Sequence, residues 1–429
     1  MANTDHEAAF GEAIRRDHFS FAPEYRPLNH GSFGAFPRNV AEHRRQLQLE
    51  TEARPDTFLR DTYPKLLLEA RAAVAPLIGA HTDEVVFVPN ATTGVNTVLR
   101  NLGFREGDVV LHFNTIYGAC LKTIQSLGET TAATPHAIDI TYPVEDDEIV
   151  RLFEEAVRSI RAQGKTVRLA VFDTVLTFPG VRFPWEPLVR LCKDLGILSF
   201  VDGAHGIGHI DLTHLGQLKP DFMISNCYKW LMVPRGCAVL YVPFANQHII
   251  RTTFPTSWGY ETPEVRPTMT TTEYFVRLFV KVSTSDTTPY ICIPQALAFR
   301  RDICGGEEKV RGYCEKMARE GGRRVAEILG TEVLENKSQT LGRCCFANVR
   351  LPLSPSRLGL AGPEGVRVAR WIKEKTPEYE TYLPTSSYAG AFWSRLSGQV
   401  YLTMDDFEWA AKTLLEICRR VEAGEWKQV

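Results

Sequence analysis

A lysine and an aspartate each follow an apolar run of this chain. Asp202 comes directly after Ile197-Leu-Ser-Phe-Val201, and Lys229 comes shortly after Phe222-Met-Ile-Ser225. A lysine amine can form a Schiff base with an aldehyde, and a carboxylate can keep a pyridine nitrogen protonated so that the ring accepts electrons. Chemistry based on pyridoxal phosphate (PLP) requires both groups. We therefore predict PLP as the cofactor, with Lys229 and Asp202 as catalytic residues.

Two further segments supply groups that such a cofactor needs. Pro89-Asn-Ala-Thr92-Thr93-Gly94 follows one predicted strand and opens a helix, so its backbone N–H groups can bind a phosphate. Plain N-caps for an apolar helix are the competing interpretation of this segment. Tyr117 lies beyond the next predicted strand, where it can stack on a pyridine ring or act as an acid, unless it is a core tyrosine at a helix start.

Arg395 is the candidate group for the carboxylate of a substrate. It lies in Trp393-Ser-Arg395-Leu-Ser-Gly-Gln-Val-Tyr401, and we expect it to precede an apolar strand. A planar guanidinium can bind a carboxylate through two parallel hydrogen bonds. A surface salt bridge is the alternative for an arginine in this position.

Residues of metal-ligand type gather at and after Asp202 and give a competing hypothesis. They are Asp202, His205, His209, Asp211 and His214. Intervening glycines disfavour a rigid helix that carries two histidine ligands, and a metal site leaves Lys229 without a role. We therefore predict no metal. A metallohydrolase built on Asp202, His205 and His209, and a binding protein without a cofactor, stay as alternatives.

Between about residues 84 and 242, short apolar runs alternate with amphipathic segments. The predicted strands are short, rich in β-branched residues and bounded by turn residues; they span 84–89, 108–113, 167–172, 197–201 and 237–242. Helical spacing predicts helices over 147–163 and 185–195. The alternation predicts an α/β fold with a mostly parallel sheet, whose ligands bind at the carboxyl ends of the strands. Asp202 and Lys229 both belong to that edge.

After about residue 290 the pattern changes to that of a smaller α+β domain. A long helical stretch from 294 to 329 precedes a candidate strand over 343–350 and helices over 365–375 and 405–422. A chain of this length exceeds the size at which one core usually stops growing. We predict an N-terminal segment (1–35), a large PLP-binding domain (36–290) and a small C-terminal domain (291–429).

Composition narrows the possible partners. The 429 residues carry a formal net charge of -2 without a dense run of Lys and Arg, which disfavours nucleic acid and anionic membranes. Met1-Ala-Asn-Thr-Asp-His-Glu7 does not resemble a secretory signal, and the chain has no apolar stretch that could span a bilayer, so we expect a cytoplasmic protein. The ten cysteines are scattered, and we expect reduced, mostly buried thiols.

Two longer motifs connect these residues to a known family. Leu28-Asn-His-Gly-Ser-Phe-Gly34 is followed by Pro37, and Cys227-Tyr-Lys229-Trp-Leu by Pro234-Arg-Gly236. From Leu28 to about Ala411, the chain resembles the class V aminotransferase-like PLP enzymes of fold type I, in their isopenicillin N epimerase-like branch. Fold type I implies a large domain with helices on both faces of a mostly parallel sheet.

The resemblance assigns roles to the candidate residues. It implies that Lys229 bonds to the cofactor, that Asp202 pairs with the pyridine nitrogen and that Tyr117 covers the ring. The remaining expected cofactor contacts are Ala91, Thr92, Thr93, His205, Asn226 and Thr284. The expected substrate contacts are Arg395, Asn29, His30 and Ser32.

The resemblance also implies a homodimer whose active site borrows a loop from the partner. Val282-Ser-Thr284-Ser-Asp286-Thr-Thr288-Pro-Tyr290 matches that loop, so Thr284 is expected to reach the phosphate in the other subunit. Bacterial members usually carry Gly-Thr-Arg-Asp there, whereas this chain has Ser285 in place of the arginine. Tyr228 replaces the usual histidine before the lysine, and Tyr401-Leu402 replaces Tyr-Asn. These departures indicate a substrate different from that of the epimerases.

Three more segments are most similar to the fungal branch of this family. They are Ile116-Tyr-Gly-Ala-Cys120, Tyr290-Ile-Cys-Ile-Pro294 and Asp405-Asp-Phe-Glu-Trp-Ala410. That branch includes a lyase that cleaves hercynylcysteine sulfoxide and loline-type enzymes that form carbon–carbon bonds. The resemblance implies elimination of a sulfur group from a cysteine-type amino acid, with Tyr117 as the acid. Carbon–carbon bond formation and desulfurase-like or epimerase-like activity stay open as alternatives.

Overall fold

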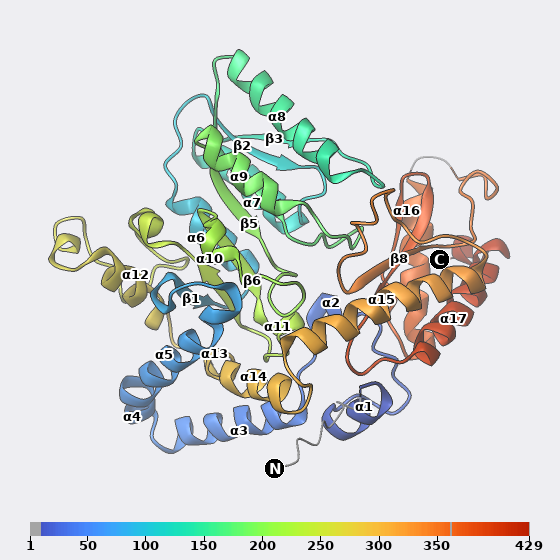
Figure 1. The fold of residues 1–429 in the computed structure, drawn as a ribbon, viewed down its shortest axis with the longest axis horizontal. Helices are drawn as coiled ribbons and strands as arrows, with labels where there is room; N and C mark the ends of the chain where they lie inside the picture. The colour runs from blue at the N-terminus through green and yellow to red at the C-terminus, as the bar shows by residue number, and fades with distance from the viewer. Residues whose placement is uncertain (1–9, 361–362, 429) are drawn as a thin grey trace, which may run out of the picture.

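The computed structural model describes residues 10–360 and 363–428, and Figure 1 shows their arrangement. The first nine residues, with the acidic N-terminal stretch, lie outside the described residues. Helices flank a large sheet on both sides, and the C-terminal elements gather at one end of the molecule. Among the described residues, no helix combines the length and the apolar composition needed to cross a membrane. All ten cysteines are free thiols and buried, as expected.

A seven-stranded sheet in the order β1-β7-β6-β5-β4-β2-β3 forms the centre of the large domain within the described residues. Its strands are β1 (Val85–Val88), β2 (Asp108–Phe113), β3 (Thr134–Ile138), β4 (Thr166–Asp173), β5 (Leu198–Asp202), β6 (Phe222–Asn226) and β7 (Ala238–Tyr241). β7 is antiparallel to β1 and β6, and the other neighbouring pairs are parallel. This confirms the predicted sheet. The prediction missed β3, which is an exposed edge strand that contains Pro135.

Side chains alternate between the two faces of the sheet along each strand, and both faces are buried in a core cluster. Val171 and Phe200 belong to one core cluster, and Phe172 and Val201 belong to the other. The first cluster includes residues of α6 (Ala91–Asn101), α7 (Gly118–Thr130) and α12 (Thr271–Val280). The second includes residues of α8 (Asp146–Ala162) and α9 (Trp185–Leu195), the two helices predicted in this region.

Shorter and N-terminal helices complete the large domain and the segment before it. They are α1 (Glu12–His18), α2 (His30–Phe33), α3 (Arg38–Ala53), α4 (Pro55–Thr57), α5 (Tyr63–Val74), α10 (Leu215–Leu218), α11 (Cys227–Trp230) and α13 (Thr288–Ile291). α2 packs against α11 near the middle of the molecule (Figure 1). Arg15 of α1 and Arg26 each lie 2.6 Å from the buried carboxylate of Asp406, so the N-terminal segment is tied to the C-terminal domain.

The C-terminal domain has its own antiparallel sheet in the order β8-β10-β9. Its elements are α14 (Ile293–Asp302), α15 (Glu307–Leu329), β8 (Phe346–Arg350), α16 (Glu364–Lys375), β9 (Thr385–Tyr388), β10 (Ala391–Ser397) and α17 (Met404–Glu422). α13 spans the proposed boundary at 290/291, and both α13 and α14 pack against α3 and α5. The three-part division of the chain therefore stays a proposal.

Two sequence predictions in this region were wrong. The helical stretch from 294 to 329 is two helices, and the segment between them contains Gly305 and Gly306, whose φ angles of 76° and 101° interrupt a helix. Arg395 lies inside β10 and not before a strand. All seven residues of β10 are buried, so the alternation of exposed and buried residues that reveals a half-buried strand is missing there.

Candidate active site

Lys229 lies in α11, which directly follows the central strand β6. It is buried, and its Nζ is 3.0 Å from Nε2 of His205. Burial and then the positive charge of Arg395 lower the pKa of Lys229 to about 7, although the carboxylates of Asp202 and Asp173 act in the opposite direction. A neutral amine is the nucleophilic form of lysine. The site therefore prepares Lys229 to react near neutral pH.

His205 is held as a neutral ring beside the lysine. Burial lowers its pKa well below the ordinary value, and the positive charge of Lys229 adds to that effect. The indole N–H of Trp230 donates to Nδ1 of His205 at 3.3 Å, so the ring carries its proton on Nε2. Nε2 lies 3.0 Å from Lys229 Nζ and 3.3 Å from the hydroxyl of Thr177. His205 thus presents an N–H donor to the site.

Asp202 ends β5 at the same sheet edge and is buried. One carboxylate oxygen accepts the backbone N–H of Ala204 at 2.9 Å, and the other accepts the thiol of Cys120 at 3.2 Å. Burial raises the pKa of Asp202, whereas these two hydrogen bonds and the charge of Lys229 favour the ionised form. The carboxylate is therefore fixed in one orientation.

Helix α6 begins next to β6 and presents its N-terminus to the site. The Asn226 side chain accepts the backbone N–H of Ala91 at 2.9 Å, which ties the start of α6 to the end of β6. Gly94 permits this close approach, because a Cβ there would lie 2.4 Å from Cδ1 of Ile224. Asn226 is thus seen to position the helix start.

The two predicted phosphate-binding threonines differ in their surroundings. Asn90 caps α6, and its side-chain oxygen accepts the backbone N–H of Thr93 at 2.9 Å and the Thr93 hydroxyl at 3.1 Å. Thr92 is exposed, and its hydroxyl has no hydrogen-bond partner within the described part of the chain. Thr92 is therefore the one of the pair whose hydroxyl is available to a ligand. The N-cap interpretation is confirmed for Asn90, and the phosphate site at the same helix start stays a prediction.

Arg395 is buried in β10 with its guanidinium against the ring of Phe346, at 4.5 Å from the ring centroid. It donates to the Thr177 carbonyl at 2.6 Å, to Asn29 Oδ1 at 2.9 Å and to Ser32 Oγ at 3.0 Å. All three acceptors are neutral, and Nε has no partner among the described residues. Burial lowers the pKa of Arg395 to about 10. The alternative interpretation, a surface salt bridge, is therefore wrong, and the guanidinium carries an unbalanced buried charge.

The Asn-His-Gly-Ser-Phe-Gly motif forms α2 and lies between Arg395 and Lys229. Asn29 and Ser32 contact Arg395, as described above, whereas His30 faces the backbone behind the lysine. His30 Nε2 is 2.6 Å from the Lys229 carbonyl, and Nδ1 is 2.7 Å from the Tyr401 hydroxyl. Burial lowers the pKa of His30 to about 3. His30 therefore supports the lysine segment, and the structure gives it no contact with Arg395.

Tyr117 and Thr284, like Thr92, are predicted site residues that are exposed. Tyr117 precedes α7 and is 46% exposed, with Tyr228 among its electrostatic neighbours. Thr284 lies exposed in the loop between α12 and α13, and it makes no hydrogen bond within the described residues. In that loop, Asp286 pairs with Arg44 of α3 at 3.0 Å. Thr284 forms no hydrogen bond to the other predicted site residues of this chain.

The alternative metal cluster does not form. Nε2 of His209 accepts the backbone N–H of Cys345 at 2.7 Å, and His214 stacks on Trp185. Asp211 accepts the backbone N–H of Thr213. Among the residues that the structure describes, no group of three or more His, Cys, Asp or Glu side chains is arranged to hold a metal ion. The histidines that suggested a metallohydrolase contact other parts of the chain: His205 lies beside Lys229, His209 accepts from Cys345 and His214 stacks on Trp185.

The prediction missed three residues that belong to this site. Asp173 ends β4 beside Asp202, and the Cys120 thiol donates a hydrogen bond to Asp202. The hydroxyl of Thr177 lies within hydrogen-bond distance of His205 Nε2, and its carbonyl accepts from Arg395. Asp173 follows the predicted strand over 167–172, so the rule that singled out Asp202 could have found it. Cys120 and Thr177 carry no signal of their own, because their partners are distant in the sequence.

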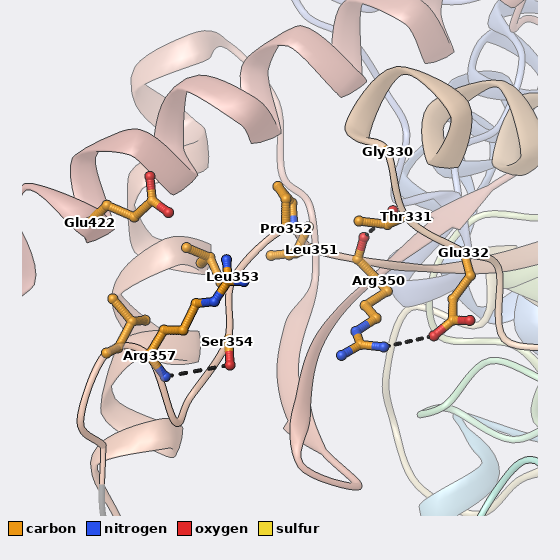
Figure 2. Close-up of a pocket in the computed structure, with 11 residues that line it drawn as sticks. Gly330, Thr331, Glu332, Arg350, Leu351, Pro352, Leu353, Ser354, Arg357 and Glu422 are labelled. Carbon is orange, nitrogen blue, oxygen red and sulfur yellow. Dashed lines mark hydrogen bonds and ion pairs between the residues drawn. The ribbon is translucent and has the colours of Figure 1, made fainter.

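A separate cleft of about 640 Å³ lies in the C-terminal domain and is shown in Figure 2. Its charged side chains are partly paired with each other: Arg350 donates to Glu332 at 2.9 Å. The backbone N–H of Arg357 donates to Ser354 Oγ at 3.5 Å. None of the predicted site residues lines this cleft.

The residues around Lys229 fit PLP. Lys229, Asp202 and Arg395 are buried and charged or titratable, and within the described residues none of them forms an ion pair shorter than 4.0 Å. Lys229 would bond the cofactor, Asp202 would hold its pyridine nitrogen, and the start of α6 would bind its phosphate. Arg395 would bind the carboxylate of an amino acid.

Comparisons with known proteins agree with this fit. The aminotransferase class-V family model matches residues 56–273. The L-cysteine desulfhydrase-like protein lolT1 of Epichloe uncinata is 40% identical over 96% of both chains. The hercynylcysteine sulfoxide lyase of Schizosaccharomyces pombe is 33% identical over 95% of this chain and 98% of that protein. The solved structure of the cystine C-S lyase C-DES with cysteine persulfide is 19% identical, covers 92% of this chain and 98% of that chain, and superposes with a TM-score of 0.73.

Proposed function

This chain belongs to the aminotransferase class-V family, and we propose that it is a PLP-dependent lyase that cleaves a carbon–sulfur bond of a cysteine-type amino acid. The observation that carries the proposal is the buried Arg395 guanidinium, which lacks an acidic partner among the described residues and influences the pKa of Lys229. Such a charge needs an anion, and the carboxylate of an amino acid is the one that the site can use. The relatives named as desulfhydrase-like protein and sulfoxide lyase support a sulfur leaving group.

The proposed roles follow from the position of each side chain. Bound PLP supplies an electron sink for the carbon from which a proton is removed. Lys229, neutral near pH 7, accepts that proton, and Asp202 keeps the pyridine nitrogen protonated. Arg395, supported by Asn29 and Ser32, fixes the substrate carboxylate and hence the bond to be broken.

Tyr117 is the proposed acid for the departing sulfur. It precedes α7, is 46% exposed and lies close enough to Tyr228 to influence the pKa of that residue. A phenol can donate a proton to a leaving group in this position. Tyr117→Phe should therefore lower turnover most for poor leaving groups and least for good ones.

The test is pyruvate release from cysteine S-conjugates and cysteine sulfoxides by the protein loaded with PLP. We expect pyruvate from the wild type and none from Lys229→Ala, whereas Lys193→Ala on the exposed face of α9 should keep full activity. Borohydride reduction should trap the cofactor on Lys229. If the wild type releases no pyruvate from any of these substrates, the proposal is wrong.

Carbon–carbon bond formation is the second candidate. It rests on the similarity of residues 116–120, 290–294 and 405–410 to the fungal branch of the family, which also includes loline-type enzymes. The same assay separates the two, because bond formation gives a heavier amino acid and no pyruvate. Mass spectrometry of the products would detect it.

We also propose a homodimer with shared active sites. Thr284 lies on an exposed loop and makes no hydrogen bond within the described residues of its own chain, as expected of a loop that serves a partner. Light scattering should give twice the chain mass. Mixing inactive Lys229→Ala with Thr284→Ala subunits should restore part of the activity, since some dimers then contain one intact site.

A further inference from the structure

Asp173 is a buried carboxyl group to which the proposed function gives no role. It ends β4 and is 6% exposed. Its Cα is in register with that of Asp202 in the neighbouring parallel strand β5. The backbone N–H of Thr174 donates to the Asp202 carbonyl at 3.0 Å, which joins the two strand ends. Neighbouring strands lie about 4.8 Å apart, so two carboxyl groups leave the sheet side by side.

Both carboxyl groups leave the sheet on the face covered by α6 and α7. Val171 and Phe200, two residues before each aspartate, belong to the core cluster on that face, and side chains alternate along a strand. Cys120 of α7 reaches Asp202 there. The titratable groups that influence Asp173 or are influenced by it are Asp202, Lys229, Cys120 and Tyr142.

Hydrogen bonds distinguish the two aspartates. Asp202 accepts from Ala204 and Cys120, and both bonds stabilise its ionised form. The Asp173 carboxyl has no hydrogen-bond partner in the described ranges 10–360 and 363–428. Like charges in one buried site disfavour each other, so the second negative charge is not stabilised. Burial and then the charge of Asp202 raise the pKa of Asp173 well above the ordinary value, against the effect of Lys229.

We propose that Asp173 is a carboxylic acid at neutral pH and that the Asp173–Asp202 pair carries one negative charge. Asp173 then offers an O–H donor to an oxygen atom of the cofactor or substrate bound at Asp202 and Lys229. A carboxyl group kept neutral in order to donate a hydrogen bond is a known device of buried enzyme sites. The inference deepens the proposed function, because it concerns the same site. It does not depend on which bond is cleaved.

The first test measures the pKa of Lys229 in the protein without PLP, from the pH dependence of its acetylation by mass spectrometry. Asp173→Asn replaces a neutral group by a neutral group of the same shape, so the pKa of Lys229 should stay unchanged. The double variant Asp173→Asn/Asp202→Asn removes the one negative charge of the pair and leaves no carboxyl group to take it up, so it should lower that pKa by about 1 unit or more. A fall in the pKa of Lys229 in Asp173→Asn alone would overturn the proposal.

The second test observes the proton directly by infrared spectroscopy of protein labelled with ¹³C-aspartate. The wild type should show the carbonyl band of a protonated aspartate at neutral pH, and Asp173→Asn should lose it. Asp173→Glu, which keeps an acid outside the label, should also lose the band and serves if the asparagine variant does not fold. Absence of the band from the wild type sinks the proposal. Both tests are independent of pyruvate release, so their failure leaves the proposed lyase function untouched.

Discussion

Replacement of Arg395 by glutamine should remove the recognition of the substrate carboxylate. Arg395 is 2% exposed, and its three hydrogen-bond acceptors are neutral, so its charge is left for the ligand. Breaking a buried charged hydrogen-bonded pair costs about 2–5 kcal/mol. Since about 1.4 kcal/mol is a factor of ten, this corresponds to a loss of about 30- to 4,000-fold. Because water is excluded from Arg395, we expect a loss in kcat/KM of about 10²- to 10³-fold.

The assay compares an amino acid substrate with an amine that lacks the carboxylate. Arg395→Gln should lose kcat/KM for the cysteine conjugate, whereas binding of the corresponding cysteamine conjugate, followed by the PLP absorbance, should be the same as in the wild type. Arg350→Gln is the matched control, because Arg350 pairs with Glu332 in the separate cleft of Figure 2. An equal loss for both ligands, or a loss below tenfold for the amino acid, would refute the carboxylate contact.

Three further predictions concern Lys229 and the segment that packs behind it. Gly34→Ala should abolish folding to the native state, measured by thermal unfolding, because the residue has φ of 66° and a Cβ would lie 1.8 Å from the Tyr228 carbonyl oxygen. His30→Ala should lower the free energy of unfolding in urea by about 2 kcal/mol or more, since it leaves the Lys229 carbonyl and the Tyr401 hydroxyl buried without a partner. The rate at which the apoprotein captures PLP should rise with pH only up to about 7, where Lys229 becomes neutral, and a rise that continues toward 10.5 in stopped-flow absorbance would contradict the lowered pKa. The lowered pKa also affects stability. Between pH 7 and 10.5, Lys229 binds more protons in the unfolded state than in the folded state, so its contribution to the free energy of unfolding increases as the pH rises.

The sequence located Lys229 and Asp202 because one physical rule applies to both. Ligands of parallel sheets bind at the carboxyl ends of strands, and apolar runs reveal where strands end. The same rule applies to Asp173, which also follows a predicted strand. Its role is not evident from the sequence, because Lys229 and Asp202 already supply the lysine and the carboxylate that PLP requires.

Other contacts could not be predicted because they join residues far apart in the chain. Asn29 and Arg395 are separated by 366 positions, and His30 and Lys229 by 199. No local pattern states that His30 turns to the lysine backbone while its neighbour Asn29 turns to the arginine. Only the packing of α2 between α11 and the C-terminal domain decides this.

The fold brings together three buried side chains of the site, none of which has a partner of opposite charge among the described residues. Asp202, Lys229 and Arg395 come from β5, α11 and β10, and within the described residues no ion pair closes among them. Each buried charge without a partner destabilises the free protein. A cofactor with a pyridine nitrogen and an aldehyde, together with a substrate carboxylate, provides a partner for each of them. The unpaired state of these groups in the folded chain is therefore the strongest structural argument that PLP and an amino acid belong to this site.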